Sequence, residues 1–212
     1  MSILSELSRH LLVPVVVVDR VSDAESLADA LVAGGLPVAE VTFRTEAGPG
    51  ALAAMAKRGG LVLGAGTVLT PQQVDQAVDA GAQYIVSPGL SRPVVERALE
   101  RGVLPLPGAV TATEIQAALE LGLNAVKFFP AGTSGGAKAV AALAAPFGGL
   151  QFVPTGGIDA ANLADYLAVK AVAAVGGSWM VPKALVNAAD FDQITRLTAE
   201  AVAAAQAARP TA

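Results

Sequence analysis

The segment YIVSPGLSRPVVERALERGVLPLP, residues 84–107, carries the pattern that decides the fold. A short apolar run, Tyr84–Ser87, is followed by a Pro-Gly loop, a helix-periodic stretch that begins after Ser91 and stops at Gly102, and a second apolar run, Val103–Pro107. Buried strands of parallel sheets have this apolar composition, and parallel strands need a crossover connection such as the helix between them. The segment therefore predicts a strand–helix–strand unit.

This unit recurs along the chain, with eight strand candidates and no break in composition. Eight units favour a closed (β/α)8 TIM barrel over an open doubly wound sheet, and the first turn lacks the glycine fingerprint of dinucleotide-binding folds. We therefore expect a single α/β domain over residues 1–212, with an additional N-terminal helix in residues 1–12 and a frayed tail at 208–212. The predicted strands are Val13–Val18, Ala39–Arg44, Leu61–Gly66, Tyr84–Ser87, Val103–Pro107, Ala125–Phe129, Phe152–Thr155 and Val172–Gly176.

Local signals predict where the elements begin and end. Polar residues that favour helix N-caps precede several helical stretches, and glycines follow them. Pro105 and Pro107 remove hydrogen-bond donors from the fifth strand, which we expect to be short or distorted. Residues 191–207 repeat apolar side chains at helical spacing and should form the last helix. The expected N-caps are Ser22 (with Glu25), Thr70, Ser91, Thr111 (with Glu114) and Asp159, and the expected stops are Gly34, Gly81, Gly102 and Gly122.

The composition argues against several classes of function. A formal net charge of −4 and the lack of a clustered Lys/Arg stretch argue against nucleic-acid binding, so any anion must be bound locally. The chain has no Cys and a single His, His10, which disfavours disulfides, thiol chemistry, a His-rich metal site and a Ser/His triad. The longest apolar runs, such as Leu11–Val18, are far shorter than the ~20 residues that span a bilayer. We expect a cytoplasmic protein with no metal, cofactor or membrane partner.

A lysine lies inside the sixth predicted strand, in Asn124-Ala-Val-Lys127-Phe-Phe-Pro130. Strand alternation puts Ala125, Lys127 and Phe129 on one face. If that face is the barrel interior, burial disfavours the ammonium form and leaves some neutral amine that can attack a carbonyl. The alternative is a lysine that extends from a strand end into solvent.

The second predicted strand ends in Glu40-Val-Thr-Phe-Arg44-Thr-Glu46. The period of two puts Glu40, Thr42 and Arg44 on one face, with the acid deeper and the arginine nearer the mouth. A buried Glu beside a Lys could transfer protons, and Arg44 could hold a substrate carboxylate by two hydrogen bonds. A structural Glu–Arg pair inside the barrel is the alternative.

Three glycine-containing loops follow other strands at the end where barrel active sites form. Gly64-Ala-Gly-Thr67 would let a ligand or another backbone approach closely, and Thr67 offers a hydroxyl or caps the next helix. Pro154-Thr-Gly-Gly-Ile158 and Gly176-Gly-Ser178 follow the seventh and eighth strands, where barrels often bind phosphate on glycine amides. Each loop taken singly could also be an ordinary turn.

These motifs occur in one order along the chain, together with Ser87-Pro-Gly89, Pro107-Gly108 and Gly177-Ser-Trp179. No single motif is specific, but the ordered set resembles the 2-keto-3-deoxy-6-phosphogluconate (KDPG) / 4-hydroxy-2-oxoglutarate (KHG) aldolase family over nearly the whole chain. The resemblance implies a class I aldolase, which forms a Schiff base with its substrate, needs no metal and forms a homotrimer. The implied small-molecule partners are pyruvate and a phosphorylated aldehyde.

The resemblance also implies a role for each candidate residue. Lys127 forms the Schiff base, Glu40 is the general acid/base, and Arg44 and Thr67 bind the pyruvyl carboxylate. The other predicted substrate-binding residues are Pro88, Phe129 and, largely at the phosphate end, Thr155, Gly156, Gly157, Gly177 and Ser178.

The implied reaction is cleavage of KDPG to pyruvate and D-glyceraldehyde 3-phosphate, with KHG cleavage to pyruvate and glyoxylate as a second reaction. The galactonate isomer of KDPG is an alternative substrate, because loop geometry decides the contacts to one hydroxyl. An isomerase or epimerase on a phosphate-binding barrel would not need Lys127 as a nucleophile. A non-catalytic or engineered oligomeric barrel would keep the site only as a relic, and the intact Lys127, Glu40 and Arg44 argue against inactivity.

Overall fold

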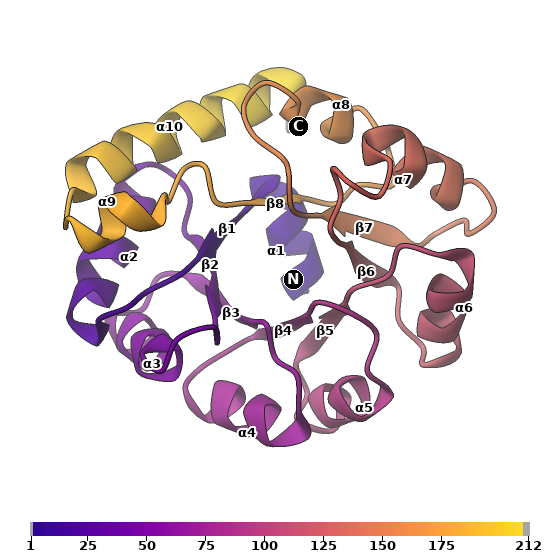
Figure 1. The fold of residues 1–212 in the computed structure, drawn as a ribbon, viewed down its shortest axis with the longest axis horizontal. Helices are drawn as coiled ribbons and strands as arrows, with labels where there is room; N and C mark the ends of the chain where they lie inside the picture. The colour runs from indigo at the N-terminus through magenta and orange to yellow at the C-terminus, as the bar shows by residue number, and fades with distance from the viewer. Residues whose placement is uncertain (1, 210–212) are drawn as a thin grey trace.

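The computed structural model describes residues 2–209, in which parallel strands alternate with helices. Figure 1 shows the strands in a central ring with most helices outside it, whereas α1 lies across the end of the ring farther from the viewer. The strands are β1 (Leu12–Val16), β2 (Val38–Thr42), β3 (Val62–Gly66), β4 (Tyr84–Ser87), β5 (Leu104–Pro107), β6 (Ala125–Phe128), β7 (Gln151–Pro154) and β8 (Val175–Gly177). The helices are α1 (Ile3–His10), η1 (Val21–Asp23, a 3-10 turn), α2 (Ala24–Ala33), α3 (Gly48–Arg58), α4 (Pro71–Asp79), α5 (Arg92–Glu100), α6 (Ala112–Glu120), α7 (Gly136–Ala144), α8 (Leu163–Leu167), α9 (Lys183–Asn187) and α10 (Phe191–Ala208).

Six strands form one curled parallel sheet in the order β5-β4-β3-β2-β1-β8, and β6 and β7 form a second, two-stranded parallel sheet. One isolated parallel bridge joins Gly108, just after β5, to Lys127 of β6. Another joins Thr155, just after β7, to Gly176 of β8. Because all pairings are parallel, the carboxyl ends of neighbouring strands meet at the same edge, where their loops can build one site.

The break between β5 and β6 follows from the prolines of β5. The amide of Gly108 donates back to β4, so by alternation along the strand the nitrogens of residues 105 and 107 face β6. Pro105 and Pro107 carry no N–H there. The first amide beyond them that reaches β6 is that of Ala109, which donates to the carbonyl of Lys127 at 2.8 Å. The prediction of a short fifth strand is confirmed, since β5 has 4 residues.

The predicted strands agree with the observed ones to within one or two residues at each end, except for the eighth. That strand was expected from Val172 but begins at Val175, because the stretch before it is bound to β7, where Ala173 N donates to Phe152 O at 2.9 Å. The second strand ends at Thr42, so residues 43 and 44 lie in a turn.

The predicted helix ends are largely confirmed. Thr70 and Thr111 are N-caps whose hydroxyls accept backbone amides, and Thr111 with Glu114 forms a capping box. Ser91 is the N-cap of α5 without a side-chain hydrogen bond. Gly34 is the C-cap of α2, and glycines with positive φ directly follow the C-caps of three further helices, namely Gly81, Gly102 and Gly122.

Two predicted N-caps are wrong. Ser22 lies inside η1, and the N-cap of α2 is Asp23, whose carboxylate is bound by Arg20 at 2.9 Å instead of capping the helix. Asp159 lies in the turn before α8, where its carboxylate accepts the amide of Ala161, and Asn162 is the N-cap. Ser22 thus lies one residue before the actual N-cap, whereas the side chain of Asp159 is taken by a hydrogen bond within the turn.

The chain end is ordered further than predicted. The last helix, expected over 191–207, is confirmed as α10, which continues to Ala208. Arg209 donates from Nε to the carbonyl of Leu167 at 2.8 Å and from Nη1 to that of Val172 at 2.7 Å. The predicted frayed tail is therefore wrong for residues 208 and 209, and residues 210–212 lie outside the described part of the chain. None of the helices over residues 2–209 combines the length and apolar composition that crossing a bilayer requires.

Candidate active site

A lysine and a glutamate that are far apart in the sequence are in contact inside the ring of strands. Lys127 of β6 donates from Nζ to Oε1 of Glu40 of β2 at 3.1 Å, and their side chains are 7% and 4% exposed. Desolvating two charges is unfavourable, and an ion pair of this kind is often no more stable than an apolar substitute. Stability therefore does not account for the pair, and the burial of Lys127 excludes the alternative that its side chain extends from a strand end into solvent.

Gly64 and Gly66 of β3 make room for the side chains around this pair. A Cβ atom added to Gly66 would lie 2.8 Å from Cγ and 2.9 Å from Cδ of Glu40, and closer still to Oε1. One added to Gly64 would overlap the ring of Tyr84. The sequence predicted that these glycines admit a ligand or another backbone; they admit two side chains instead.

Tyr84 forms part of the buried layer beside the pair. Burial, and secondarily the Glu40 carboxylate, raise the pKa of the Tyr84 hydroxyl well above its usual value. The hydroxyl therefore stays protonated and donates to the carbonyl of Ala39, the residue before Glu40, at 2.9 Å. This bond fixes the backbone that carries the glutamate.

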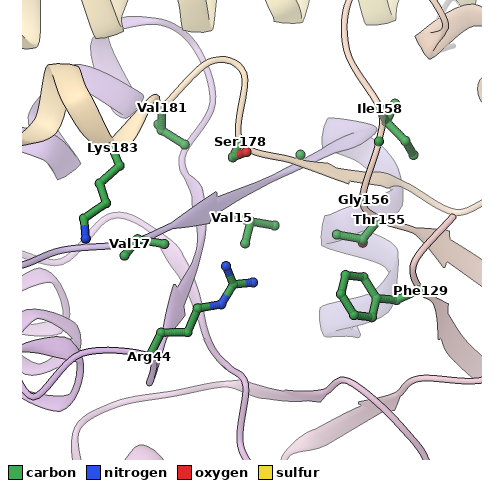
Figure 2. Close-up of a pocket in the computed structure, with 12 residues that line it drawn as sticks. Val15, Val17, Arg44, Phe129, Thr155, Gly156, Ile158, Ser178, Val181 and Lys183 are labelled. Carbon is green, nitrogen blue, oxygen red and sulfur yellow. The ribbon is translucent and has the colours of Figure 1, made fainter. Parts of the chain in front are cut away.

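A cavity of about 340 Å³ opens at the carboxyl ends of the strands. Figure 2 shows Phe129, Thr155, Gly156 and Ile158 on one side of it and Arg44, Val17 and Lys183 on the other, with Val15 and Ser178 between them. Its complete lining is Val15, Val17, Arg44, Phe129, Thr155, Gly156, Gly157, Ile158, Gly177, Ser178, Val181 and Lys183.

Phe129 connects this cavity to the buried pair. The Lys127 ammonium lies 5.2 Å from the centroid of the Phe129 ring, and that ring lines the cavity. A cation over an aromatic face at this distance is attracted electrostatically. A small carbonyl compound in the cavity would thus lie next to Lys127, which among residues 2–209 is the one lysine buried beside a carboxylate.

Arg44 reaches into the cavity from the turn after β2, and its Nε donates to Oγ1 of Thr67 at 3.3 Å. Thr67 has a φ of 59°, a left-handed conformation that is uncommon for a residue other than glycine. The alternative that Thr67 caps the next helix is wrong, because Thr70 is that N-cap. The guanidinium keeps its other donors for an anion.

The loops after β7 and β8 present free backbone donors to the cavity. Gly156 and Gly157 have φ values of 92° and 73°, which favour glycine. Within residues 2–209, no acceptor binds the backbone amides of Gly156, Gly157 or Ser178. Thr155 is nearly buried, and its side chain fills the space over Gly176, where a Cβ atom would lie 3.1 Å from that of Thr155. Backbone amides that lack an acceptor within the protein are a common means of binding an anion.

The structure brings most of the predicted site residues together, with some exceptions. Lys127, Glu40 and Thr67 lie beside the cavity without lining it. Pro88 is exposed and outside the lining, and its carbonyl group packs against Gly108, where an added Cβ atom would lie 2.5 Å from the carbonyl carbon. Pro88 therefore supports the backbone next to Lys127 instead of contacting the cavity.

Sequence reasoning missed five lining residues. Four are apolar, namely Val15, Val17, Ile158 and Val181, and the fifth is Lys183. The only available signal was position, because all five lie at or just after the carboxyl ends of strands one, seven and eight. Across residues 2–209, no three His, Asp or Glu side chains gather in a way that could hold a metal ion.

Comparisons with known proteins agree with this geometry. The family model "KDPG and KHG aldolase" matches residues 3–197. The KHG/KDPG aldolase of Escherichia coli (strain K12) is 49% identical over 196 residues, which cover 92% of each chain. The 2-dehydro-3-deoxy-phosphogluconate aldolase of Treponema pallidum (strain Nichols) is 50% identical over 198 residues, covering 93% of this chain and 94% of that one. A crystal structure of KDPG aldolase from Legionella pneumophila, with pyruvate captured as a covalent carbinolamine intermediate, superposes with a TM-score of 0.90 at 36% identity, covering 94% of this chain and 98% of that one.

Proposed function

The chain belongs to the KDPG and KHG aldolase family, and we propose that it cleaves KDPG to pyruvate and D-glyceraldehyde 3-phosphate through a Schiff base at Lys127. The observation that carries the assignment of Lys127 is its burial beside Glu40, with 3.1 Å between Nζ and Oε1, next to the cavity. A lysine in such surroundings can act as a nucleophile when its proton passes to a neighbouring base.

The first half of the reaction makes the imine. The Lys127 amine attacks the C2 ketone of the substrate to give a carbinolamine. Loss of water then gives an iminium that draws electrons from the bond between C3 and C4. Glu40, directly or through water, transfers the protons that these steps require, because its carboxylate already contacts the amine.

The second half breaks the carbon–carbon bond. Glu40 removes the proton of the C4 hydroxyl, the C3–C4 bond breaks, and its electron pair forms the pyruvyl enamine on Lys127. Glyceraldehyde 3-phosphate leaves as the aldehyde. The enamine then takes a proton at C3, and hydrolysis of the imine frees pyruvate and the lysine. One carboxylate can serve each transfer, since it is returned to its charged form by the end of the cycle.

The two ends of the substrate have separate partners. Arg44, with Thr67 beside it, binds the carboxylate of the pyruvyl part through charge-assisted hydrogen bonds. The free amides of Gly156, Gly157 and Ser178 bind the phosphate, with Thr155 and Gly177 forming the adjoining wall. KHG, which ends in a carboxylate instead of a phosphate, is a second substrate, in keeping with the name of the E. coli relative.

The architecture that we propose for this enzyme is a closed barrel. We infer one domain over the whole chain, in which the two sheets are parts of one closed (β/α)8 barrel and α1 is its additional N-terminal helix. The bridges from Gly108 to Lys127 and from Thr155 to Gly176 support this closure. A homotrimer, a cytoplasmic location and the lack of a metal requirement stay predictions.

The experiment that tests the function is release of pyruvate from KDPG, followed with a coupled lactate dehydrogenase assay in buffer containing EDTA. We expect equal amounts of pyruvate and glyceraldehyde 3-phosphate, with turnover unaffected by the chelator. Loss of activity on chelation would contradict a metal-free mechanism, and a lack of pyruvate release would contradict the proposed reaction.

A further inference from the structure

The cavity has a second cation that the proposed mechanism does not use. Lys183 is the first residue of α9, and it lines the cavity across from Phe129 and Thr155, on the same side as Arg44 (Figure 2). Arg44 and Lys183 are the two charged residues in the lining, which includes no acid. Lys183 is paired with the carboxylate of Asp19, which lies outside the lining.

Lys183 is held in place by a short network of polar side chains. Its Nζ lies 2.9 Å from Oδ2 of Asp19, and the Asn187 amide donates to the same oxygen at 3.0 Å. Arg20 in turn donates to the carbonyl of Asn187 at 2.9 Å. The network joins the loop after β1 to α9, which are more than 160 residues apart in sequence.

Stability does not explain this network well. The side chains of Lys183 and Asp19 are 51% and 37% exposed, and exposed ion pairs contribute little to folding. The hydrogen bonds from Lys183, and next from Asn187, lower the pKa of Asp19, so its carboxylate stays charged near neutral pH. A fixed carboxylate restricts the lysine side chain to the cavity mouth while it occupies one of three ammonium donors.

The proposed substrate carries two anionic groups, a carboxylate next to the reacting ketone and a phosphate at the other end of a six-carbon chain. Arg44 binds the carboxylate in the proposed function. Ser178, whose amide has no acceptor among the described residues, lies between the two walls of the cavity and only five residues before Lys183.

We propose that Lys183, positioned by Asp19 and Asn187, binds the phosphate end of the substrate from the Ser178 side and so determines the preference for phosphorylated substrates. This inference rests on the proposed function, and it adds a residue to it. Pyruvate alone lacks a distal end, so Lys183 does not affect its binding.

The test is a pair of measurements on Lys183→Met. We expect KM for KDPG to rise about tenfold, the factor that one charge-assisted hydrogen bond to a partly exposed anion supplies, with kcat changed by less than about twofold. The pyruvate concentration for half-maximal borohydride trapping should not change, and inorganic phosphate should become a weaker competitive inhibitor. Lys183→Arg should restore most of the KM, and Lys57→Met, at the exposed end of α3, is the matched control.

The outcomes distinguish failure of the role proposed for Lys183 from failure of the proposed aldolase function. Equal losses in KM for KDPG and in pyruvate trapping would show that Lys183 only supports the fold, and no change in either would show that it does not contact the phosphate; both overturn the inference. If the unaltered protein neither traps pyruvate nor cleaves KDPG, the proposed function itself fails.

Discussion

Gly66→Ala should disable the enzyme by displacing one carboxylate. The new methyl group would lie 2.9 Å from Cδ of Glu40, whereas ordinary contacts of a Cβ atom begin near 3.4 Å. Gly66 has no positive φ, so the substitution brings no backbone strain and acts only through this overlap. The carboxylate must therefore move, and its hydrogen bond with Lys127 is the contact it loses.

The size of the effect follows from the role of Glu40. A misplacement of about 1 Å in a catalytic group can lower the rate about 10²-fold, and general acid–base catalysis as a whole supplies about 10²–10⁴-fold. We expect kcat for KDPG to fall about 10²-fold. Overpacking should destabilise the protein by about 1–3 kcal/mol, and each kcal/mol lowers Tm by about 2–4 °C in a chain of this size. The protein should thus remain folded at 25 °C.

The assay is pyruvate release with purified variants, with Tm measured in parallel. Gly148→Ala is the control, because that glycine has ordinary φ and open space around it in a loop before β7. The decisive comparison repeats Gly66→Ala in a Glu40→Ala background, where the overlap is gone and kcat should change by less than about twofold. An undiminished kcat in Gly66→Ala, or an equal loss in both backgrounds, would refute the reasoning.

Two further predictions concern stability. Arg209→Ala should lower the free energy of unfolding by about 1–3 kcal/mol, because it leaves the carbonyls of Leu167 and Val172 without their donor; urea unfolding measures this, and an unchanged midpoint would contradict it. For Glu114, the amide of Val110 is the main cause that lowers the carboxyl pKa below 4.5 in the folded protein. The stability that the charged Glu114 carboxylate contributes is present above the unfolded pKa and is lost as pH falls through the folded pKa. The stability of Glu114→Gln should therefore depend less on pH below about pH 4.5 than that of the unaltered protein. Identical acid unfolding transitions of the two proteins would argue against this.

The period of two along a strand made the central pair predictable. Alternation alone puts Glu40 on one face of β2 with Thr42, and Lys127 on one face of β6 with Ala125. The burial of both side chains in the structure shows that these faces are the inner ones. What alternation could not give is that the two side chains meet, at 3.1 Å, because this depends on how far the sheets curl. The apolar pattern also predicted that the second strand reaches Arg44, whereas Arg44 lies in the turn that follows β2.

The glycines show another limit of sequence reasoning. The pattern of Gly64 and Gly66 indicated a close approach, but the approaching groups are the Tyr84 ring and the Glu40 carboxylate, which come from other strands. A missing side chain shows that space is needed, not what fills it.

The cavity rim was the least predictable part. Lys183 and Val17 lie on loops and helix ends that have no periodic pattern, and their place beside Arg44 depends on contacts between distant segments. Pro88 was assigned to the site because its motif lies at a strand end, yet its backbone carbonyl faces Gly108 instead.

The most direct test of the central claim is borohydride reduction of the protein with pyruvate, followed by mapping of the adduct by mass spectrometry. The chain has five lysines, at positions 57, 127, 138, 170 and 183, and Lys127→Ala is the control. We expect one reduced pyruvate adduct, on Lys127, which is absent from the control. No adduct, or one spread over the surface lysines, would contradict the Schiff-base mechanism.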